Sequence, residues 1–199
     1  MDPRTIAAYD SDPAAYADEW ENEQDAPTDL YALLTDHWQP GPTVDIGCGS
    51  GRDTAWLSSH GFPTVGIDAS DGLLAEARRR HPDMQFASGS LPRLDRLADA
   101  SFTNVLCETV IMHLPEDEVA PSVSRMLRLL IPGGSIYLSW RVTRGADRRD
   151  DAGRLYAAFD ESAVMGALTG VTILVDDEVI SSSSGKIVRR IIARTAPPV

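Results

Sequence analysis

The chain has 199 residues, the length of one domain with modest additions, and 43% of them are hydrophobic, enough for a substantial core. Its net charge of −12 argues against a nucleic-acid partner, because phosphate binding needs a concentrated basic surface. It has no run of eighteen apolar residues, no signal-peptide pattern and only two cysteines, so we expect a cytoplasmic protein with no membrane partner.

Residues 1–27 form an acidic leader. The first 25 residues contain eight Asp or Glu and one basic residue, Arg4, and they also contain Tyr9, Tyr16 and Trp20. We expect an irregular or partly helical segment that folds over the edge of a sheet as a lid. Residues 28–199 would then form the single domain.

From residue 28 onward, short apolar runs alternate with helical patterns, which predicts a parallel sheet with helices on both faces. The expected helices cover residues 28–38, 52–59, 71–80, 116–130 and 161–168. The expected strands cover residues 43–46, 64–67, 84–87, 102–107, 135–140, 171–175 and 187–193. The last two strands are expected to form an antiparallel hairpin around the serine-rich segment 181–185. Pro132-Gly133-Gly134 should stop the fourth helix and form a loop.

The strongest signal in the sequence is Thr43-Val44-Asp45-Ile46-Gly47-Cys48-Gly49-Ser50-Gly51-Arg52. A buried strand runs into glycines at alternate positions and then directly into a helix. Such glycines permit positive φ and let a ligand approach the backbone. Nineteen residues after Gly49, Asp68 ends the next strand, where a carboxylate can accept both hydroxyls of a ribose.

The loop differs from the dinucleotide-binding fingerprint, which would place its third glycine where this chain has Arg52. Asp45, two residues before Gly47, would repel a pyrophosphate and attract an amino group or a sulfonium. The segment therefore favours a positively charged, amino-acid-bearing nucleoside over a nicotinamide dinucleotide. The alternative is a strand-to-helix turn with a purely structural role.

With these residues in place, the sequence resembles the class I S-adenosylmethionine-dependent methyltransferases. The matching segments, in the family's order and spacing, are residues 44–51, 66–70, 86–92, 102–107 and 130–134. The resemblance covers about residues 40–141. It implies a Rossmann-like, doubly wound α/β sheet of seven strands with the last strand antiparallel, and S-adenosyl-L-methionine as methyl donor. It does not identify the substrate.

Carried over by position, the resemblance assigns residues to each part of the donor. The backbone around Gly47 and Gly49 would contact the methionine part, with Asp45 beside it, and Asp68 would hold the ribose. The residues assigned to the adenine and the floor of the site are Ala69, Ser90, Leu91 and Cys107. The family commonly has aspartate in place of Ser90, so a hydroxyl would replace one adenine contact. In relatives a leader tyrosine closes over the donor, which indicates Tyr16.

Candidate acceptor residues follow the fourth and fifth strands. His113 lies in a His-Leu-Pro segment that the family often has, and it would be a catalytic base or an acceptor-orienting donor, or would only brace the next helix. Arg141 would clamp a carboxylate of the acceptor, or pair with the acidic leader. Glu108, Trp140 and Tyr9 are the further candidates for acceptor binding.

Five arginines between Arg141 and Arg154 alternate with aspartates, which is typical of a solvated face. Residues 153–156 nevertheless resemble a segment that folds back to the pocket in small-molecule members of the family. The histidines and cysteines have no metal-ligand spacing, so no metal is expected.

We therefore expect an S-adenosylmethionine-dependent methyltransferase that acts on an O, N or S atom of a small metabolite, as a monomer or homodimer. One alternative is a non-catalytic module that binds the nucleoside for regulation. A nicotinamide-dependent oxidoreductase is a second alternative, and Asp45 and Arg52 disfavour it.

Overall fold

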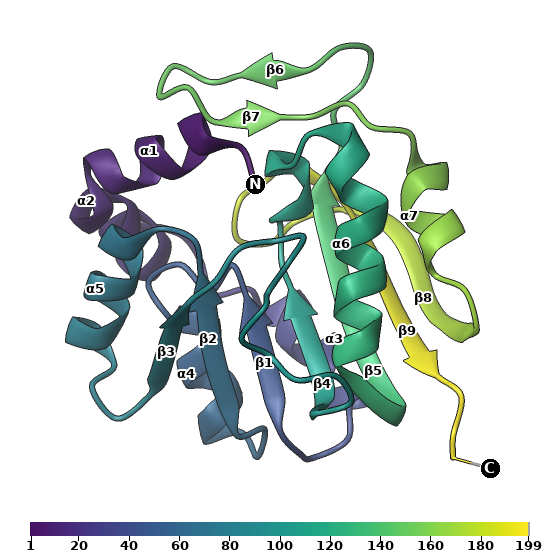
Figure 1. The fold of residues 1–199 in the computed structure, drawn as a ribbon. Coiled ribbons are helices and arrows are strands. Elements are labelled where there is room, and N and C mark those ends of the chain that lie inside the picture. The colour runs from purple at the N-terminus through teal and green to yellow at the C-terminus, as the bar shows by residue number, and fades with distance from the viewer. Residues whose placement is uncertain (199) are drawn as a thin grey trace.

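The computed structural model describes residues 1–198, and its centre is a seven-stranded sheet with helices on both faces (Figure 1). The strands of this sheet are β1 (Thr43–Ile46), β2 (Thr64–Asp68), β3 (Gln85–Ser88), β4 (Phe102–Cys107), β5 (Leu130–Arg141), β8 (Val171–Ile180) and β9 (Ile187–Thr195). The helices are α1 (Pro3–Ser11), α2 (Pro13–Asp18), α3 (Thr28–His37), α4 (Arg52–Ser59), α5 (Asp71–Arg80), α6 (Glu116–Leu129) and α7 (Glu161–Ala167). The shorter elements are the π-helical turn η1 (Glu19–Glu23), the 3₁₀ turn η2 (Ile111–His113) and a hairpin of β6 (Arg148–Arg149) and β7 (Leu155–Tyr156).

The strand order across the sheet is β3-β2-β1-β4-β5-β9-β8. Strand β1 is parallel to β2 and β4, whereas β9 is antiparallel to β5 and β8. The predicted sheet of seven strands with an antiparallel last strand is confirmed. Because the chain moves outward from β1 to β3 and then crosses back to β4, the strand order reverses between β1 and β4. The carboxyl ends of these two strands are where open α/β sheets bind ligands.

Successive residues of β4 and β5 point to opposite faces of the sheet and pack into the core on each side. Val105 and Ile136 pack in the cluster that includes α6 and α7, while Leu106 and Tyr137 pack with α3 and α4. All four side chains are fully buried, which the period of two in a strand allows only when both faces are covered. Within residues 1–198, no helix combines the length and the apolar composition that crossing a membrane requires.

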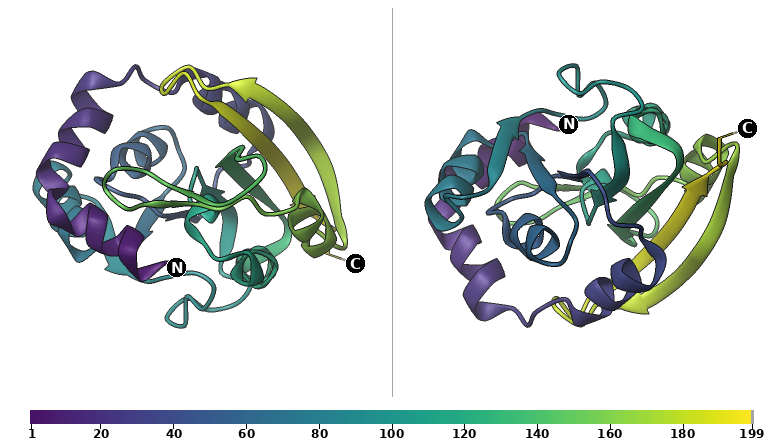
Figure 2. Two further views of the ribbon diagram at one scale, coloured as in Figure 1. Left: turned by 90° about the horizontal axis from the view of Figure 1, so that it is seen from above. Right: turned by 90° about the horizontal axis from the view of Figure 1, so that it is seen from below.

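The leader is helical over most of its length. Asp2 and Asp12 cap α1 and α2, because their carboxylates accept the backbone N–H of Thr5 at 2.9 Å and of Ala15 at 3.2 Å. Each of these aspartates is followed by a proline at the first helical position, where its missing N–H costs nothing. Seen from above, α1 and α2 lie beside α5, and the β6–β7 hairpin crosses the end of the sheet toward them (Figure 2).

The segment Pro132–Gly134 differs from the expectation. The helix ends before it, at Leu129, but Leu130 already belongs to β5, and the expected loop is instead an irregular stretch of that strand. The backbone N–H of Gly133 donates to the carbonyl of Ala196 at 2.8 Å. This contact with the chain beyond β9 keeps the segment in the sheet, which the local sequence does not reveal.

Candidate active site

A cavity of about 390 Å³ lies at the carboxyl ends of β1, β2, β4 and β5. The leader and the β6–β7 hairpin both contribute to its walls. The two segments are tied together, since the backbone N–H of Leu155 donates to Thr5 Oγ1 at 2.9 Å and Arg149 pairs with Asp2 at 2.8 Å. Residues 150 positions apart in the chain thus enclose one site.

The glycine-rich loop presents bare backbone at this cavity. Gly47 lines it with φ +77°, and a Cβ there would lie 2.3 Å from Val110 Cγ2. Gly49 has φ +54°, and a Cβ there would lie 2.6 Å from the ring of Trp20. Both positions need glycine, because the backbone conformation and the surrounding side chains leave no room for a larger residue.

Two carboxyl groups line the same end of the cavity. Asp68 accepts the backbone N–H of Gly49 at 2.9 Å and of Ser70 at 2.8 Å, and Asp45 accepts the hydroxyl of Thr54 at 2.7 Å. Burial raises the pKa of both groups, that of Asp45 to about 8, and neighbouring carboxylates add to the shift. A positive charge placed here would favour the ionised form of both groups, so this end of the cavity suits a cationic ligand.

The residues assigned to the adenine lie on the adjoining wall. Ala69, Ser90 and Leu91 line the cavity, and the Ser90 hydroxyl donates to the carbonyl of Leu91 at 3.0 Å. That hydroxyl is therefore engaged within the chain. Cys107 is fully buried at the end of β4 and is not among the residues that line the cavity, which begin at the next residue, Glu108.

Aromatic residues of the leader approach the cavity unequally. Tyr9 and Trp20 line it, whereas Tyr16 does not and instead packs edge-on against Tyr9, with ring centroids 5.1 Å apart. The guanidinium of Arg154 lies 5.3 Å from the centroid of the Tyr9 ring and 4.9 Å from that of Tyr16. Trp20, in the π-helical turn η1, lies over the glycine loop, whereas the sequence indicated Tyr16 as the residue that closes over the donor.

Arg154 lines the cavity, although the charge pattern of residues 141–154 predicted a solvent-exposed face. The run from Arg141 to Arg154 is exposed over residues 144–149, as expected of a solvated face, but Arg154 lines the cavity. Asp150 holds it there by accepting from Arg154 Nε at 2.6 Å. The resemblance of residues 153–156 to a pocket-lining segment was the signal that pointed to this position.

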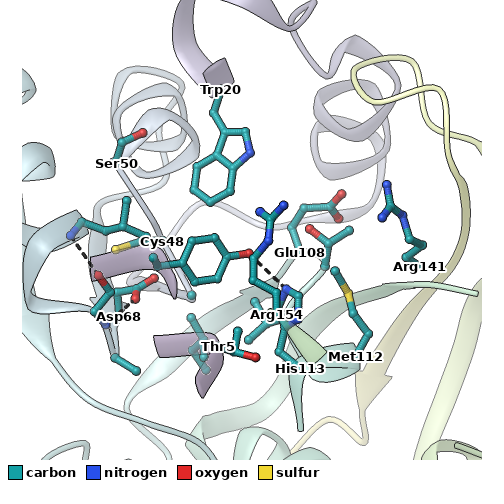
Figure 3. Close-up of a pocket in the computed structure, with 18 of the residues that line it drawn as sticks. Thr5, Trp20, Cys48, Ser50, Asp68, Glu108, Met112, His113, Arg141 and Arg154 are labelled. Carbon is teal, nitrogen blue, oxygen red and sulfur yellow. Dashed lines mark hydrogen bonds between the residues drawn. The ribbon is translucent and has the colours of Figure 1, made fainter. Parts of the chain in front are cut away.

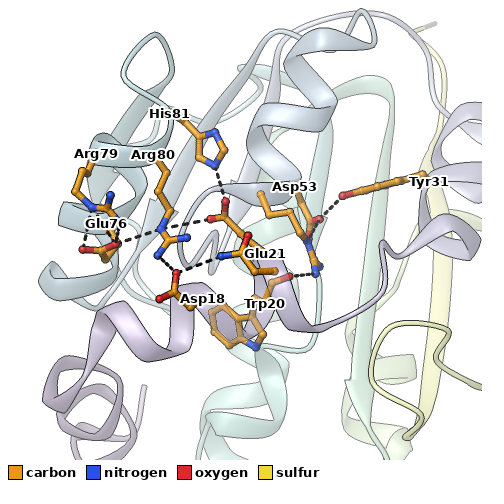
Figure 4. Close-up of polar contacts among 11 residues, drawn as sticks. Asp18, Trp20, Glu21, Tyr31, Asp53, Glu76, Arg79, Arg80 and His81 are labelled. Atoms are coloured by element: carbon orange, nitrogen blue, oxygen red, sulfur yellow. Dashed lines mark hydrogen bonds and ion pairs between the residues drawn. The ribbon is translucent and has the colours of Figure 1, made fainter.

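Polar contacts hold the turn η1 against α4 and α5 (Figure 4). Arg80 pairs with Asp18 at 2.7 Å and lies 4.0 Å from Glu21. Arg52, at the start of α4, donates to the carbonyl of Trp20 at 3.0 Å. These contacts fix the backbone on both sides of the Trp20 ring and thereby keep the ring over the glycine loop.

His113 is 4% exposed and is bonded at both ring nitrogens. Its Nδ1 contacts the carbonyl of Leu155, which only accepts, so Nδ1 carries the proton. Nε2 lies 3.1 Å from the Tyr9 hydroxyl and accepts a hydrogen bond from it. Burial lowers the pKa of His113 to about 4, so the ring is neutral at pH 7. In this arrangement His113 joins the leader to the β6–β7 hairpin.

The remaining candidates have different surroundings. Trp140 is buried outside the cavity and packs against Phe159, with ring centroids 5.7 Å apart, because its position in β5 turns it toward the face covered by α6 and α7. Glu108 and Arg141 both line the cavity (Figure 3). The Glu108 carboxyl accepts the hydroxyl of Ser139. Enclosure by protein raises the pKa of Glu108 to about 7.

The cavity therefore has two ends of different character. Bare backbone and two carboxyl groups form the end at β1 and β2, which fits a nucleoside with a positive charge. Arginine, tyrosine and one carboxyl group form the end at β4 and β5, which fits a polar small molecule. Within residues 1–198, no group of three or more His, Cys, Asp or Glu is arranged to hold a metal ion.

The sequence is similar to known methyltransferases. Residues 44–138 match the model of a methyltransferase domain. The chain is 32% identical over 165 residues to trans-aconitate 2-methyltransferase of Rhizobium meliloti, covering 80% of this chain and 60% of that protein. It is also 32% identical over 151 residues to demethylmenaquinone methyltransferase of Beutenbergia cavernae, covering 67% of this chain and 60% of that protein. The chain thus spans about 60% of the length of these curated relatives.

Solved structures share the fold. The crystal structure of Burkholderia thailandensis 1,6-didemethyltoxoflavin-N1-methyltransferase, with bound 1,6-didemethyltoxoflavin and S-adenosylhomocysteine, has a TM-score of 0.76 at 24% identity. The likeness covers 97% of this chain and 88% of that chain. Three observations indicate the same family: the fold, the domain match over the strands that build the cavity, and the relatives at 32% identity. The chain thus matches a methyltransferase domain over residues 44–138 and is similar to S-adenosylmethionine-dependent methyltransferases in its fold.

Proposed function

We propose that this chain binds S-adenosylmethionine at the acidic end of the cavity and transfers its methyl group to an O, N or S atom of a small metabolite. The observation that carries the proposal is the bare backbone at Gly47 and Gly49 beside the carboxyl groups of Asp45 and Asp68. A sulfonium nucleoside with an α-amino group matches this combination of close backbone approach and negative charge.

The size of the cavity and the names of the relatives support a small acceptor. The relatives act, by their names, on trans-aconitate and on demethylmenaquinone, and the toxoflavin enzyme was solved with its small substrate. Small-molecule sites commonly occupy about 300–1,000 Å³. The cavity of about 390 Å³ lies near the lower end of that range, which favours a compact acceptor.

We further propose that residues 1–27 act as a lid over residues 28–199. Trp20 and Tyr9 would cover the donor, because their rings line the cavity from the leader side. An aromatic face attracts a sulfonium and excludes water from it. The main task of the protein in methyl transfer is to hold the acceptor atom in line with the sulfur–methyl bond that breaks. A closed lid would restrict the acceptor to that position.

Calorimetric titration with S-adenosylhomocysteine tests the donor site. We expect the wild type to bind, the variant Asp68→Asn to bind at least tenfold more weakly, and the exposed control Asp83→Asn to match the wild type. Absence of binding to the wild type would overturn the proposal. Methyl transfer to a member of a metabolite panel would identify an enzyme, whereas donor binding without transfer to any acceptor would favour a regulatory module.

A further inference from the structure

The acceptor end of the cavity contains two titratable candidates for proton transfer, and their bonding differs. His113 donates from Nδ1 to the carbonyl of Leu155 and accepts at Nε2 from the Tyr9 hydroxyl. Neither ring nitrogen is free to take a proton from a bound acceptor unless the leader first moves away. Glu108 has no such restriction.

Glu108 follows β4, and one of its carboxyl oxygens is hydrogen-bonded within the chain while the side chain also faces the cavity. Its Oε2 accepts the hydroxyl of Ser139, the nearby Tyr137 hydroxyl also interacts with the carboxyl group, and no cationic side chain among residues 1–198 forms an ion pair with it. The side chain is only partly buried because it opens onto the cavity. The other charged or titratable groups that face it are Tyr137 on β5 and Arg52 and Asp53 on α4.

The backbone next to Glu108 is held in an uncommon conformation. Thr109 has φ +53°, which β-branched residues rarely adopt. Its N–H donates to Ser139 Oγ at 3.0 Å, and the same hydroxyl donates to Glu108. One buried serine therefore fixes both the strained turn and the carboxyl group. Strain that the surroundings maintain in this way is concentrated at functional sites.

Arg141 lines the same end of the cavity without an acidic partner. Arg52 pairs with Asp53 at 3.0 Å and Arg154 with Asp150 at 2.6 Å, but no carboxylate among residues 1–198 pairs with Arg141. Its guanidinium lies 5.0 Å from the ring centroid of Tyr156. In Figure 3, Arg141 and Glu108 lie at the end of the pocket away from Asp68.

We propose that the methyl acceptor is a small anion that carries a protonated oxygen or nitrogen nucleophile, that Arg141 binds its anionic group, and that Glu108 takes the proton from the nucleophile. This assignment rests on the proposed function and names the class of its acceptor. A guanidinium with its donors free matches a carboxylate or phosphate in a two-pronged contact. A carboxylate within reach of the O–H or N–H is the minimum that general-base catalysis needs.

The atoms and electrons balance without a further reactant. A lone pair of the acceptor oxygen or nitrogen forms the new bond to the methyl carbon. The sulfur–methyl bond breaks, and its electron pair stays on sulfur, which becomes a neutral thioether. The proton of the nucleophile passes to the Glu108 carboxylate and then to solvent when the product leaves. The raised pKa of Glu108, about 7, places this base near neutral pH.

The first test measures binding to the enzyme saturated with S-adenosylhomocysteine. The probes are malate, aspartate and 4-hydroxybenzoate, which carry an O–H or N–H, and succinate, benzoate and trans-aconitate, which carry carboxylates alone. We expect at least one probe with an O–H or N–H to bind, and Arg141→Gln to weaken that binding at least tenfold. Arg144→Gln, at a side chain that is 79% exposed, is the matched control. Absence of binding by every probe, or unchanged affinity in Arg141→Gln, would overturn the anion site.

The second test follows transfer to the bound probe as a function of pH. We expect kcat of Glu108→Gln to fall about a hundredfold while its affinity for S-adenosylhomocysteine and for the probe stays unchanged, and the rise of kcat through neutral pH to disappear. Glu116→Gln, on the exposed start of α6, is the control. Full activity in Glu108→Gln, or transfer only to probes with carboxylates alone, would overturn the role of Glu108. Failure of the wild type to bind S-adenosylhomocysteine would instead overturn the proposed function itself.

Discussion

Gly47→Ala isolates the part of the donor site that depends on packing. The substitution adds a Cβ at φ +77°, at 2.3 Å from Val110 Cγ2 and 3.2 Å from Val110 Cγ1. The left-handed backbone conformation costs a non-glycine residue about 1–2 kcal/mol. Forcing a methyl group against a buried valine costs about 1–3 kcal/mol more. We therefore expect the free energy of unfolding to fall by about 2–5 kcal/mol.

Gly61→Ala provides the matched control for the backbone contribution. Gly61 has φ +89°, and a Cβ there would meet no atom within 4 Å, so only the conformational cost of about 1–2 kcal/mol applies. Urea unfolding of the two variants should differ by about 1–3 kcal/mol, which measures the clash with Val110. Adding Val110→Ala to Gly47→Ala should recover part of that difference, since it removes both methyl groups that the new Cβ meets.

The same two variants separate stability from donor binding. Affinity for S-adenosylhomocysteine should fall more than tenfold in Gly47→Ala, because Gly47 lines the cavity, and should stay unchanged in Gly61→Ala. Equal losses of stability in the two variants would show that Val110 moves aside freely. The reasoning that packing fixes the loop would then be refuted.

Three further predictions test other parts of the molecule. Arg125→Ala should destabilise the protein by about 2 kcal/mol or more in urea unfolding, since this buried side chain donates to three backbone carbonyls; Arg128→Ala, with the side chain 57% exposed, should change stability by less than about 0.5 kcal/mol. Burial raises the pKa of Asp45 from 3.8 to about 8, so its ionisation destabilises the folded state as the pH rises through that window; Asp45→Asn should gain stability over the wild type from pH 5 to pH 8, and parallel urea midpoints would contradict this. Trp20→Ala should release S-adenosylhomocysteine roughly tenfold faster in stopped-flow measurements, and an unchanged rate would show that the ring does not cover the donor.

Sequence alone determined the parts of this protein that depend on local pattern. Hydrophobic periodicity predicted the strands and helices from residue 28 onward, and most of their ends lie within one or two residues of the prediction. The alternate glycines and the aspartate after the second strand predicted the end of the cavity at which we propose that the nucleoside binds, because each signal lies within one strand and the turn that follows it. The helices of the leader had a local signal as well, since Asp2-Pro3 and Asp12-Pro13 are N-terminal helix caps.

Only the tertiary structure decided which candidates for the acceptor end have atoms free to react. His113 is hydrogen-bonded to Tyr9, 104 residues away in the chain, and β5, which ends at Arg141, buries Trp140 against Phe159. The Ser139 hydroxyl that holds Glu108 comes from a strand 31 residues further on. Periodicity reports which face of an element is apolar, but not which distant side chain occupies a given ring nitrogen or carboxyl oxygen. Those contacts form only when the leader, the sheet and the hairpin come together.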